Sequence, residues 1–216
     1  LMTYAMYRPK SPATNLLTEA ELANMNPQEL VDRIHNQNSY KHRILYYGPS
    51  SSKDLLATIN QYHQVPAALK DIPAGNEYAY LETPVTKVLV APYDAKQIYM
   101  AQISNLDKKY DPAIEPIRAL YDQYFGGGMN SIVFQEMRET RGLAYSAWAS
   151  IMPPSYLKYP YVLRTQIAPQ NDKMIDAVTT FNDIINNMPE SEAAFKLAKD
   201  GLTNRLRTER IIKGDI

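Results

Sequence analysis

The spacing of apolar residues predicts short strands arranged in pairs, with long amphipathic helices between them. Alternating or continuous apolar runs predict strands at 42–47, 87–91, 97–103, 143–151 and 161–168. Helical spacing after a capping residue or a proline predicts helices that begin near Asn26, Ser51, Pro112, Asn130 or Ser131, Asp172 and Ser191, the last one running to about Gly214. This order of elements indicates an α+β fold, with an antiparallel sheet and helices packed on one face.

The stretch 124–146 carries the most specific signals in the chain. It begins where a helix meets three consecutive glycines, Gly126, Gly127 and Gly128. Glycines permit positive φ angles and leave room for the close approach of another segment. A short helix follows, and its apolar residues are expected to face inward: Ile132, Val133 and Met137.

A turn at Gly142 separates this short helix from the next strand. Gly142 is well placed to end the helix in a left-handed conformation. Arg138 comes before the turn and Tyr145 comes after it, so the two side chains can point into one cleft. Period-two alternation then predicts one strand face that is made of Leu143, Tyr145, Ala147, Ala149 and Ile151.

Composition places the chain among ordinary globular proteins. Its 216 residues suit one or two domains, and they are 45% apolar and 21% charged. Lys+Arg and Asp+Glu both number 23, and the resulting zero net charge argues against a dedicated nucleic-acid surface. No apolar run approaches the ~18–20 residues that span a bilayer. The absence of cysteine excludes disulfides and thiolate metal sites, and it leaves the compartment undecided.

The segment Arg138-Glu139-Thr140-Arg141-Gly142-Leu143-Ala144-Tyr145 has the form R-x-x-x-G-L-x-Y and follows a glycine-rich loop and a helix. This pattern resembles the signature of the second, non-metal half of the pitrilysin/insulinase clan of zinc metallopeptidases. A weaker resemblance extends from about Asn26 to about Gly214. The resemblance implies the metallohydrolase/LuxS-like fold of the mitochondrial processing peptidase type.

The resemblance also implies domain borders. Between 65 and 84 the chain has three prolines, a glycine and little periodicity, which is typical of a linker that crosses a surface. In the clan, a strand and a helix like those at 42–64 complete the preceding domain. The resemblance therefore implies that 1–70 is the tail of a preceding domain, 71–81 a linker, and 82–216 a non-catalytic peptidase-like domain.

Individual residues acquire expected roles from the same resemblance. It implies that Tyr145 donates a hydrogen bond to the oxyanion of the tetrahedral intermediate and that Arg138 binds a backbone carbonyl of the substrate. A fixed hydrogen-bond donor aimed at the negative charge that develops on the oxygen can stabilise the transition state by roughly 3–4 kcal/mol. Gly126, Gly127 and Gly128 are substrate-binding candidates, either as a flexible gate over an incoming peptide or as a plain turn. Without the motif, Arg138 would be a solvated charge beside a neighbouring glutamate, and Tyr145 a core residue.

The chain offers no zinc-binding motif. The clan holds zinc with H-x-x-E-H on a helix, where two histidines four residues apart share one face. His35, His42 and His63 are the histidines of the chain, and none of them begins such a motif. No metal is therefore expected here, and zinc is expected in a partner half, in the same polypeptide or in a homologous subunit. The abrupt start and finish of the chain favour one longer polypeptide.

Two functions remain open on the sequence. In the first, the chain is the non-metal half of a zinc peptidase that closes over an extended peptide, which adds as a strand to a sheet edge of the metal half. The isolated chain is then expected to have no peptidase activity. In the second, the chain is a non-enzymatic scaffold or assembly subunit of the same fold. Arg138 and Tyr145 together favour the first function, because a scaffold has no need for both.

Overall fold

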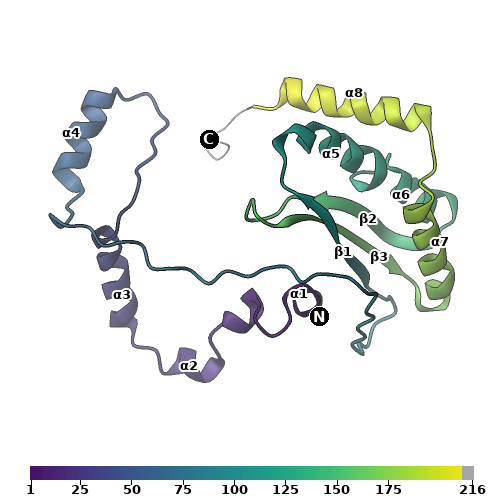
Figure 1. Ribbon diagram of the computed structural model, residues 1–216, viewed down its shortest axis with the longest axis horizontal. Helices are drawn as coiled ribbons and strands as arrows, with labels where there is room; N and C mark the ends of the chain where they lie inside the picture. Colours follow the sequence, from purple (N-terminus) through teal and green to yellow (C-terminus); the bar gives the residue numbers. More distant parts are fainter. Residues whose placement is uncertain (211–216) are drawn as a thin grey trace. The chain divides into compact units, whose positions relative to one another are not determined.

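The computed structural model describes residues 1–210 and divides them into two compact units (Figure 1). The first unit holds Leu1–Ser11 and Tyr78–Arg210, and of the described residues the second holds Pro12–Glu77. The sheet and the longest helices belong to the first unit. No helix in the described part of the chain is both long and apolar enough to cross a bilayer.

The first unit is built on a three-stranded antiparallel sheet. Its strands are β1 (Met100–Lys109), β2 (Ala144–Met152) and β3 (Pro160–Pro169), in the order β1-β3-β2, which leaves β1 and β2 as edges. The π-helical turns η4 and η5 interrupt its helical layer. The helical elements of this unit are α1 (Met2–Tyr7), η3 (Pro112–Ile114), α5 (Glu115–Tyr121), η4 (Asp122–Gly126), α6 (Ile132–Phe134), η5 (Gln135–Thr140), η6 (Asn171–Lys173), α7 (Met174–Asn186) and α8 (Glu192–Thr208).

The core of the first unit lies between one face of the sheet and the helices α5 to α8 (Figure 1). The sheet contributes Ala147 and Ala149 of β2 and Ile167 of β3, all of which are buried. Because alanine is small, the helices can lie close to β2. The buried side chains that meet this face from the helices are Tyr124, Phe125, Ile132, Val133, Met137, Ala177, Phe181, Ile184 and Ala198. The predicted α+β class with an antiparallel sheet is confirmed.

Two predicted strands are absent from the described residues, and a third is displaced. The stretches 42–47 and 87–91 have no strand partner, and the strand predicted at 97–103 begins later, at Met100, as β1. Val88 and Val90 are 81% and 84% exposed. β-Branched residues favour a strand only where a neighbouring strand supplies hydrogen bonds and packing. The apolar pattern alone was therefore insufficient at these positions.

The helix starts predicted at Asn26, Ser51, Ser131 and Ser191 are confirmed by their caps. The side chains of Asn26, Ser51, Ser131 and Ser191 each accept a hydrogen bond from a backbone N–H of the first helical turn. A cap depends on residues within three or four positions of one another, so the sequence is enough to find it. The last helix ends at Thr208, earlier than predicted, and the predicted end near Gly214 lies outside the described residues.

The second unit has helices but no apolar core among its described residues. None of its described apolar side chains is buried, and α3 exposes an apolar stripe in which Leu30 is 46%, Val31 40% and Ile34 63% exposed. A parallel bridge joins Tyr40 to Lys70. The unit therefore lacks the buried apolar surface that stabilises an independent domain. Its elements are η1 (Pro12–Asn15), α2 (Glu19–Ala23), α3 (Pro27–Asn36), η2 (Gln37–Ser39) and α4 (Ser52–Tyr62).

Candidate functional site

The turn between η5 and β2 is set by local hydrogen bonds. Gly142 has a φ of 56°, and its N–H donates to the Arg138 carbonyl at 3.1 Å. The Leu143 N–H donates to the Met137 carbonyl at 2.8 Å, and Lys173 Nζ donates to the Gly142 carbonyl at 3.0 Å. These bonds satisfy carbonyl groups that the end of a helix would otherwise leave free. The predicted left-handed cap at Gly142 is confirmed.

The helix before the turn is anchored on one side and open on the other. Ile132, Val133 and Met137 are buried, as their spacing predicted. The helix does not stay α-helical: α6 passes into the π-helical η5, which carries Arg138. Single π-helical turns recur at functional sites because they re-aim side chains. Met137 therefore fixes the turn in the core, while the neighbouring Arg138 reaches the surface, where its side chain is 41% exposed.

Tyr145 is the extra residue of a β-bulge. Ala144 and Ser146 lie opposite two consecutive residues of β3, so Tyr145 has no partner in the pairing. A bulge locally interrupts the alternation of side chains between the two faces of a sheet. Ala144 is consequently buried, and Tyr145 is 69% exposed. The prediction that Tyr145 shares a face with Ala147 and Ala149 was wrong, and so was the alternative that Tyr145 is a core residue.

The Arg138 guanidinium lies against two aromatic rings. Its Cζ is 5.0 Å from the ring centroid of Phe134 and 5.0 Å from that of Tyr145. Phe134 precedes Arg138 by four residues, the spacing at which side chains on a helix meet. Cation–π contacts on both rings restrain the planar guanidinium without neutralising it. The structure thus brings Arg138 and Tyr145 together, as the sequence predicted.

Neighbouring carboxylates pair only weakly with Arg138. Its Nε lies 3.6 Å from Glu139 Oε1, whereas Glu136 pairs with Arg141 at 3.3 Å. Exposed ion pairs of this kind contribute about 0–1 kcal/mol, because water competes with each partner. The guanidinium is therefore available to a ligand that replaces Glu139.

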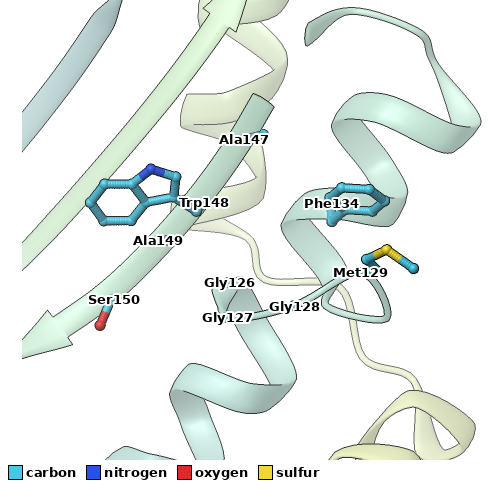
Figure 2. A pocket seen from close by; sticks show the side chains of 9 residues that line it. All are labelled: Gly126, Gly127, Gly128, Met129, Phe134, Ala147, Trp148, Ala149 and Ser150. Carbon is cyan, nitrogen blue, oxygen red and sulfur yellow. The ribbon is translucent and has the colours of Figure 1, made fainter. Parts of the chain in front are cut away.

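Two hollows border this part of the surface, and they share Met129 and Phe134. The smaller, of about 400 Å³, is lined by Met129, Asn130, Phe134, Gln135, Arg138 and Glu139. The larger, of about 410 Å³, is lined by Gly126, Gly127, Gly128, Met129, Phe134, Ala147, Trp148, Ala149 and Ser150. Figure 2 shows the glycine loop of the larger hollow between β2 and the helix that carries Phe134. A mainly apolar hollow thus adjoins a more polar one that Arg138 lines.

Gly126 and Gly127 serve close packing and not positive φ angles. None of the three glycines has a positive φ, so of the two uses that glycine permits, only close approach applies here. A Cβ built on Gly126 would lie 2.5 Å from the Ala149 nitrogen, and one built on Gly127 would lie 2.6 Å from the Asp122 carbonyl oxygen. At Gly128 the nearest atom would be 3.5 Å away, which is ordinary contact. Gly126 therefore lets the end of η4 lie directly against the backbone of β2.

Polar side chains occupy the free edge of β2 beyond Ala149. Asp122 accepts the Ile151 N–H at 2.9 Å, the Ser150 hydroxyl at 3.0 Å and Arg118 Nη1 at 2.8 Å. Arg118 Nη1 also donates to the Ile151 carbonyl at 3.0 Å. Among the described residues β2 pairs with β3 alone, so these side chains hold the backbone groups of Ile151 that another strand would need.

Burial and hydrogen bonding shift the pKa values of the carboxylates in this network in opposite directions. Burial raises the pKa of Asp122, although hydrogen bonds from Ile151 and Ser150 and the charge of Arg118 oppose the shift. The hydrogen bond from the Tyr161 hydroxyl, at 2.7 Å, is the main cause that lowers the pKa of Glu115. Arg118 also pairs with Glu115 at 2.9 Å. The network joins α5 and η4 to both β2 and β3.

No metal site accompanies these groups. The described residues contain no group of three His, Cys, Asp or Glu side chains that could hold a metal ion. Two of the three histidines, His42 and His63, do meet in the second unit, with their Nε2 atoms 2.7 Å apart, but His35 does not join them.

The sequence did not indicate Phe134 as a site residue. It also did not indicate that Arg118 and Asp122 form a hydrogen-bonded network. The available signal for Phe134 was its spacing of four residues from Arg138 on one helix. Arg118 and Asp122 have the same spacing, but their contacts with Ile151 join positions far apart in the sequence. No local pattern reports such contacts.

Several solved structures share this fold over most of the chain. The inactive domain of a peptidase M16 from Pseudomonas fluorescens has 17% identity and a TM-score of 0.58, covering 94% of this chain and 49% of that chain. A conserved protein from Enterococcus faecalis has 18% identity and a TM-score of 0.61, covering 95% and 48%. A protease from Helicobacter pylori has 12% identity and a TM-score of 0.57, covering 88% and 47%. The chain thus spans about half the length of these structures.

The family comparison covers the helix–turn–strand site as well as the sheet. No curated protein matches the chain. The profile of the family described as the peptidase M16 inactive domain matches residues 43–202, which is most of the chain and includes Arg138, Gly142 and Tyr145. The resemblance to the non-metal half of the pitrilysin-type peptidases is thereby confirmed, and the chain belongs to the peptidase M16 inactive-domain family.

Proposed function

We propose that this chain supplies the substrate-binding and oxyanion-stabilising wall of a zinc metallopeptidase of the pitrilysin/insulinase type, whose zinc-bearing partner half hydrolyses the peptide. The observation that carries the proposal is the contact between the Arg138 guanidinium and the Tyr145 ring, with Cζ 5.0 Å from the ring centroid. Both side chains are exposed, and Arg138 lines a hollow. A hydrogen-bond donor and a cation are therefore presented together to a ligand.

Tyr145 is suited to stabilise negative charge on a substrate oxygen. The bulge frees its side chain from the core, and the neighbouring guanidinium restrains its ring. When a peptide carbonyl carbon becomes tetrahedral, its oxygen gains negative charge, and the phenol O–H donates a hydrogen bond to it while keeping its proton. The nearby Arg138 strengthens this effect, because a guanidinium stays cationic at every working pH.

Arg138 is suited to bind a backbone carbonyl of the same peptide. A charge-assisted hydrogen bond from a guanidinium is shorter and stronger than a neutral one. Its contacts with Phe134 and Tyr145 already restrain the side chain, so less rotamer entropy is lost when the peptide binds. The weakly held Glu139 would be displaced by the incoming carbonyl.

Zinc and the general-base glutamate belong to the partner half in this proposal. When bound there, zinc polarises the scissile carbonyl and activates water. The described residues of this chain offer no ligand set for it. The contribution of this chain is to bind the peptide, orient it and donate to the oxyanion.

The peptide is expected to add as a strand to the sheet of the partner half. The free edge of β2 supports this arrangement, since Asp122 and Arg118 already hydrogen-bond to Ile151 and leave it no vacant backbone groups. We assign Gly126, Gly127 and Gly128 to the peptide-facing wall of the larger hollow. The tight packing of Gly126 and Gly127 favours a fixed turn over a flexible gate.

At the level of the whole protein, we propose that 1–70 is the tail of a preceding domain, 71–81 a linker, and 82–216 a domain of the mitochondrial processing peptidase type. The matched solved structures are about twice as long as this chain, which leaves room for a zinc-bearing half in the same polypeptide. A homologous subunit is the other source. The exposed apolar stripe of α3 supports an additional partner, because burial would stabilise it.

The test uses the parent protein with its zinc half and a peptide substrate. Tyr145→Phe removes one hydrogen-bond donor and keeps the ring, so kcat is expected to fall about 10²-fold while KM changes much less. Tyr99→Phe is the matched control, because Tyr99 is similarly exposed, at 65%, and lines neither hollow. An unchanged kcat in Tyr145→Phe would refute the catalytic role. A parent protein without any peptidase activity would point to the scaffold function.

A further inference from the structure

Two histidines of the second unit form a hydrogen-bonded pair. His42 Nε2 and His63 Nε2 are 2.7 Å apart, and their rings are nearly perpendicular, with centroids 4.9 Å apart. His42 begins the extended stretch 42–47, and His63 is the C-cap residue of α4. The pair therefore joins two segments of the unit, and the proposed peptidase function uses neither residue.

The tautomer of each ring follows from its neighbours. His42 Nδ1 is 2.6 Å from the Tyr40 carbonyl oxygen, which can only accept, so Nδ1 carries the proton. A neutral His42 then has its lone pair on Nε2. His63 must donate its Nε2–H to that lone pair, which leaves its own lone pair on Nδ1. The two rings are thus locked in complementary tautomers.

This arrangement can take up one additional proton but not two. The first proton can bind His63 Nδ1, which keeps the bond between the Nε2 atoms and makes it charge-assisted. His63 ends α4, where the helix dipole favours a cation. A second proton must occupy the His42 Nε2 lone pair, which already accepts the hydrogen bond. Two N–H groups and two positive charges would then face each other, and the bond would break.

The surroundings offer no compensation for a doubly charged pair. Lys41 and Arg43 flank His42, and Tyr62 precedes His63. Lys70 lies beside Lys41 through a backbone hydrogen bond, and the nearby carboxylate of Asp71 is already paired with Lys41. Among the described residues, no carboxylate forms an ion pair with either imidazole.

We propose that His42 and His63 form an acid-sensitive latch that ties the stretch 42–47 to the C-terminal end of α4. The latch is closed while the pair carries at most one additional proton. It opens in acid, when both rings are charged, because two N–H groups then face each other across the contact. Opening frees a stretch whose apolar side chains, such as Leu45 at 85%, are already exposed.

NMR of the histidine rings tests the latch in the full 216-residue chain. The spectra are recorded from pH 8 to pH 4.5 with EDTA, which removes adventitious metal. An NOE between the His42 and His63 rings is expected at pH 8, where the latch is closed, because their Nε2 atoms are 2.7 Å apart. The NOE is expected to be lost at the acidic end of the series, where the latch is open.

Two variants separate the latch from a general effect of pH on the fold. His63→Gln removes the second ring of the pair, so the NOE to His42 is expected to be absent at every pH. His35→Gln, the matched control, is expected to leave the NOE and its loss in acid unchanged. An NOE between the rings that persists at pH 4.5 in the wild type would overturn the proposal. The absence of that NOE at pH 8 in the wild type would overturn it as well.

Discussion

Replacement of Gly126 by alanine tests how closely η4 must approach β2. An added Cβ would lie 2.5 Å from the Ala149 nitrogen and 2.7 Å from its carbonyl carbon, whereas ordinary contact begins at 3.4 Å. The obstructing atoms are backbone atoms, so no side-chain rotation can remove the overlap. The Ala149 carbonyl oxygen would lie closer still, so the end of η4 would have to move by at least the difference between 3.4 Å and 2.5 Å, about 0.9 Å.

A movement of this size disturbs the core next to Gly126. Phe125 is 1% exposed and Ala149 is fully buried, so both lose contacts when η4 moves. A gap of 0.5–1 Å forfeits roughly a quarter to a half of the dispersion energy of each contact. Overpacking in a core costs about 1–3 kcal/mol and occasionally more. We expect Gly126→Ala to lower the free energy of unfolding by about 3 kcal/mol, the upper end of that range.

The assay is urea-induced unfolding followed by the fluorescence of Trp148, the one tryptophan, which lies on β2. Gly128→Ala is the matched control from the same loop. Its Cβ would meet only the Gln123 side chain, at 3.5 Å, so we expect a change below about 0.5 kcal/mol. Equal effects of the two substitutions would refute the packing argument and favour a flexible, gate-like loop.

Three further predictions concern charges near the site. In the same urea assay, Asp122→Ala is expected to lower the free energy of unfolding by about 2 kcal/mol, because the Ile151 N–H loses its acceptor and Arg118 loses a partner. The control Ser150→Ala removes one hydrogen bond and is expected to lower it by only about 1 kcal/mol. Burial raises the pKa of Asp122, so above the ordinary value of 3.8 the folded state binds more protons than the unfolded state. The stability that Asp122 contributes in this way is complete below pH 3.8. It is lost as the pH rises through the pKa of the folded state. The difference in unfolding free energy between the wild type and Asp122→Asn should therefore fall across this window, and a constant difference would contradict the shift. In the parent peptidase, Arg138→Lys is expected to lower kcat/KM about tenfold, because an ammonium lacks the planar stacking surface and the additional donors; kinetics indistinguishable from the wild type would exclude that role.

The sequence by itself determined the features that depend on near neighbours. The cap at Ser131 and the left-handed turn at Gly142 each involve residues about three or four positions apart, and both were predicted correctly. The R-x-x-x-G-L-x-Y spacing placed Arg138 and Tyr145 on the two sides of that turn. The same motif indicated the family that the comparison with the peptidase M16 inactive domain established.

Only the tertiary structure decided which apolar stretches pair with a neighbouring strand and which side chains are exposed. The alternation at 143–151 became β2 because β3 lies beside it, whereas 87–91 has no strand partner in the described chain. The bulge that exposes Tyr145 arises from the register between β2 and β3, and the need for glycine at 126 arises from the backbone of Ala149. These features depend on contacts between residues far apart in the chain, and the pattern of one sequence does not record those contacts.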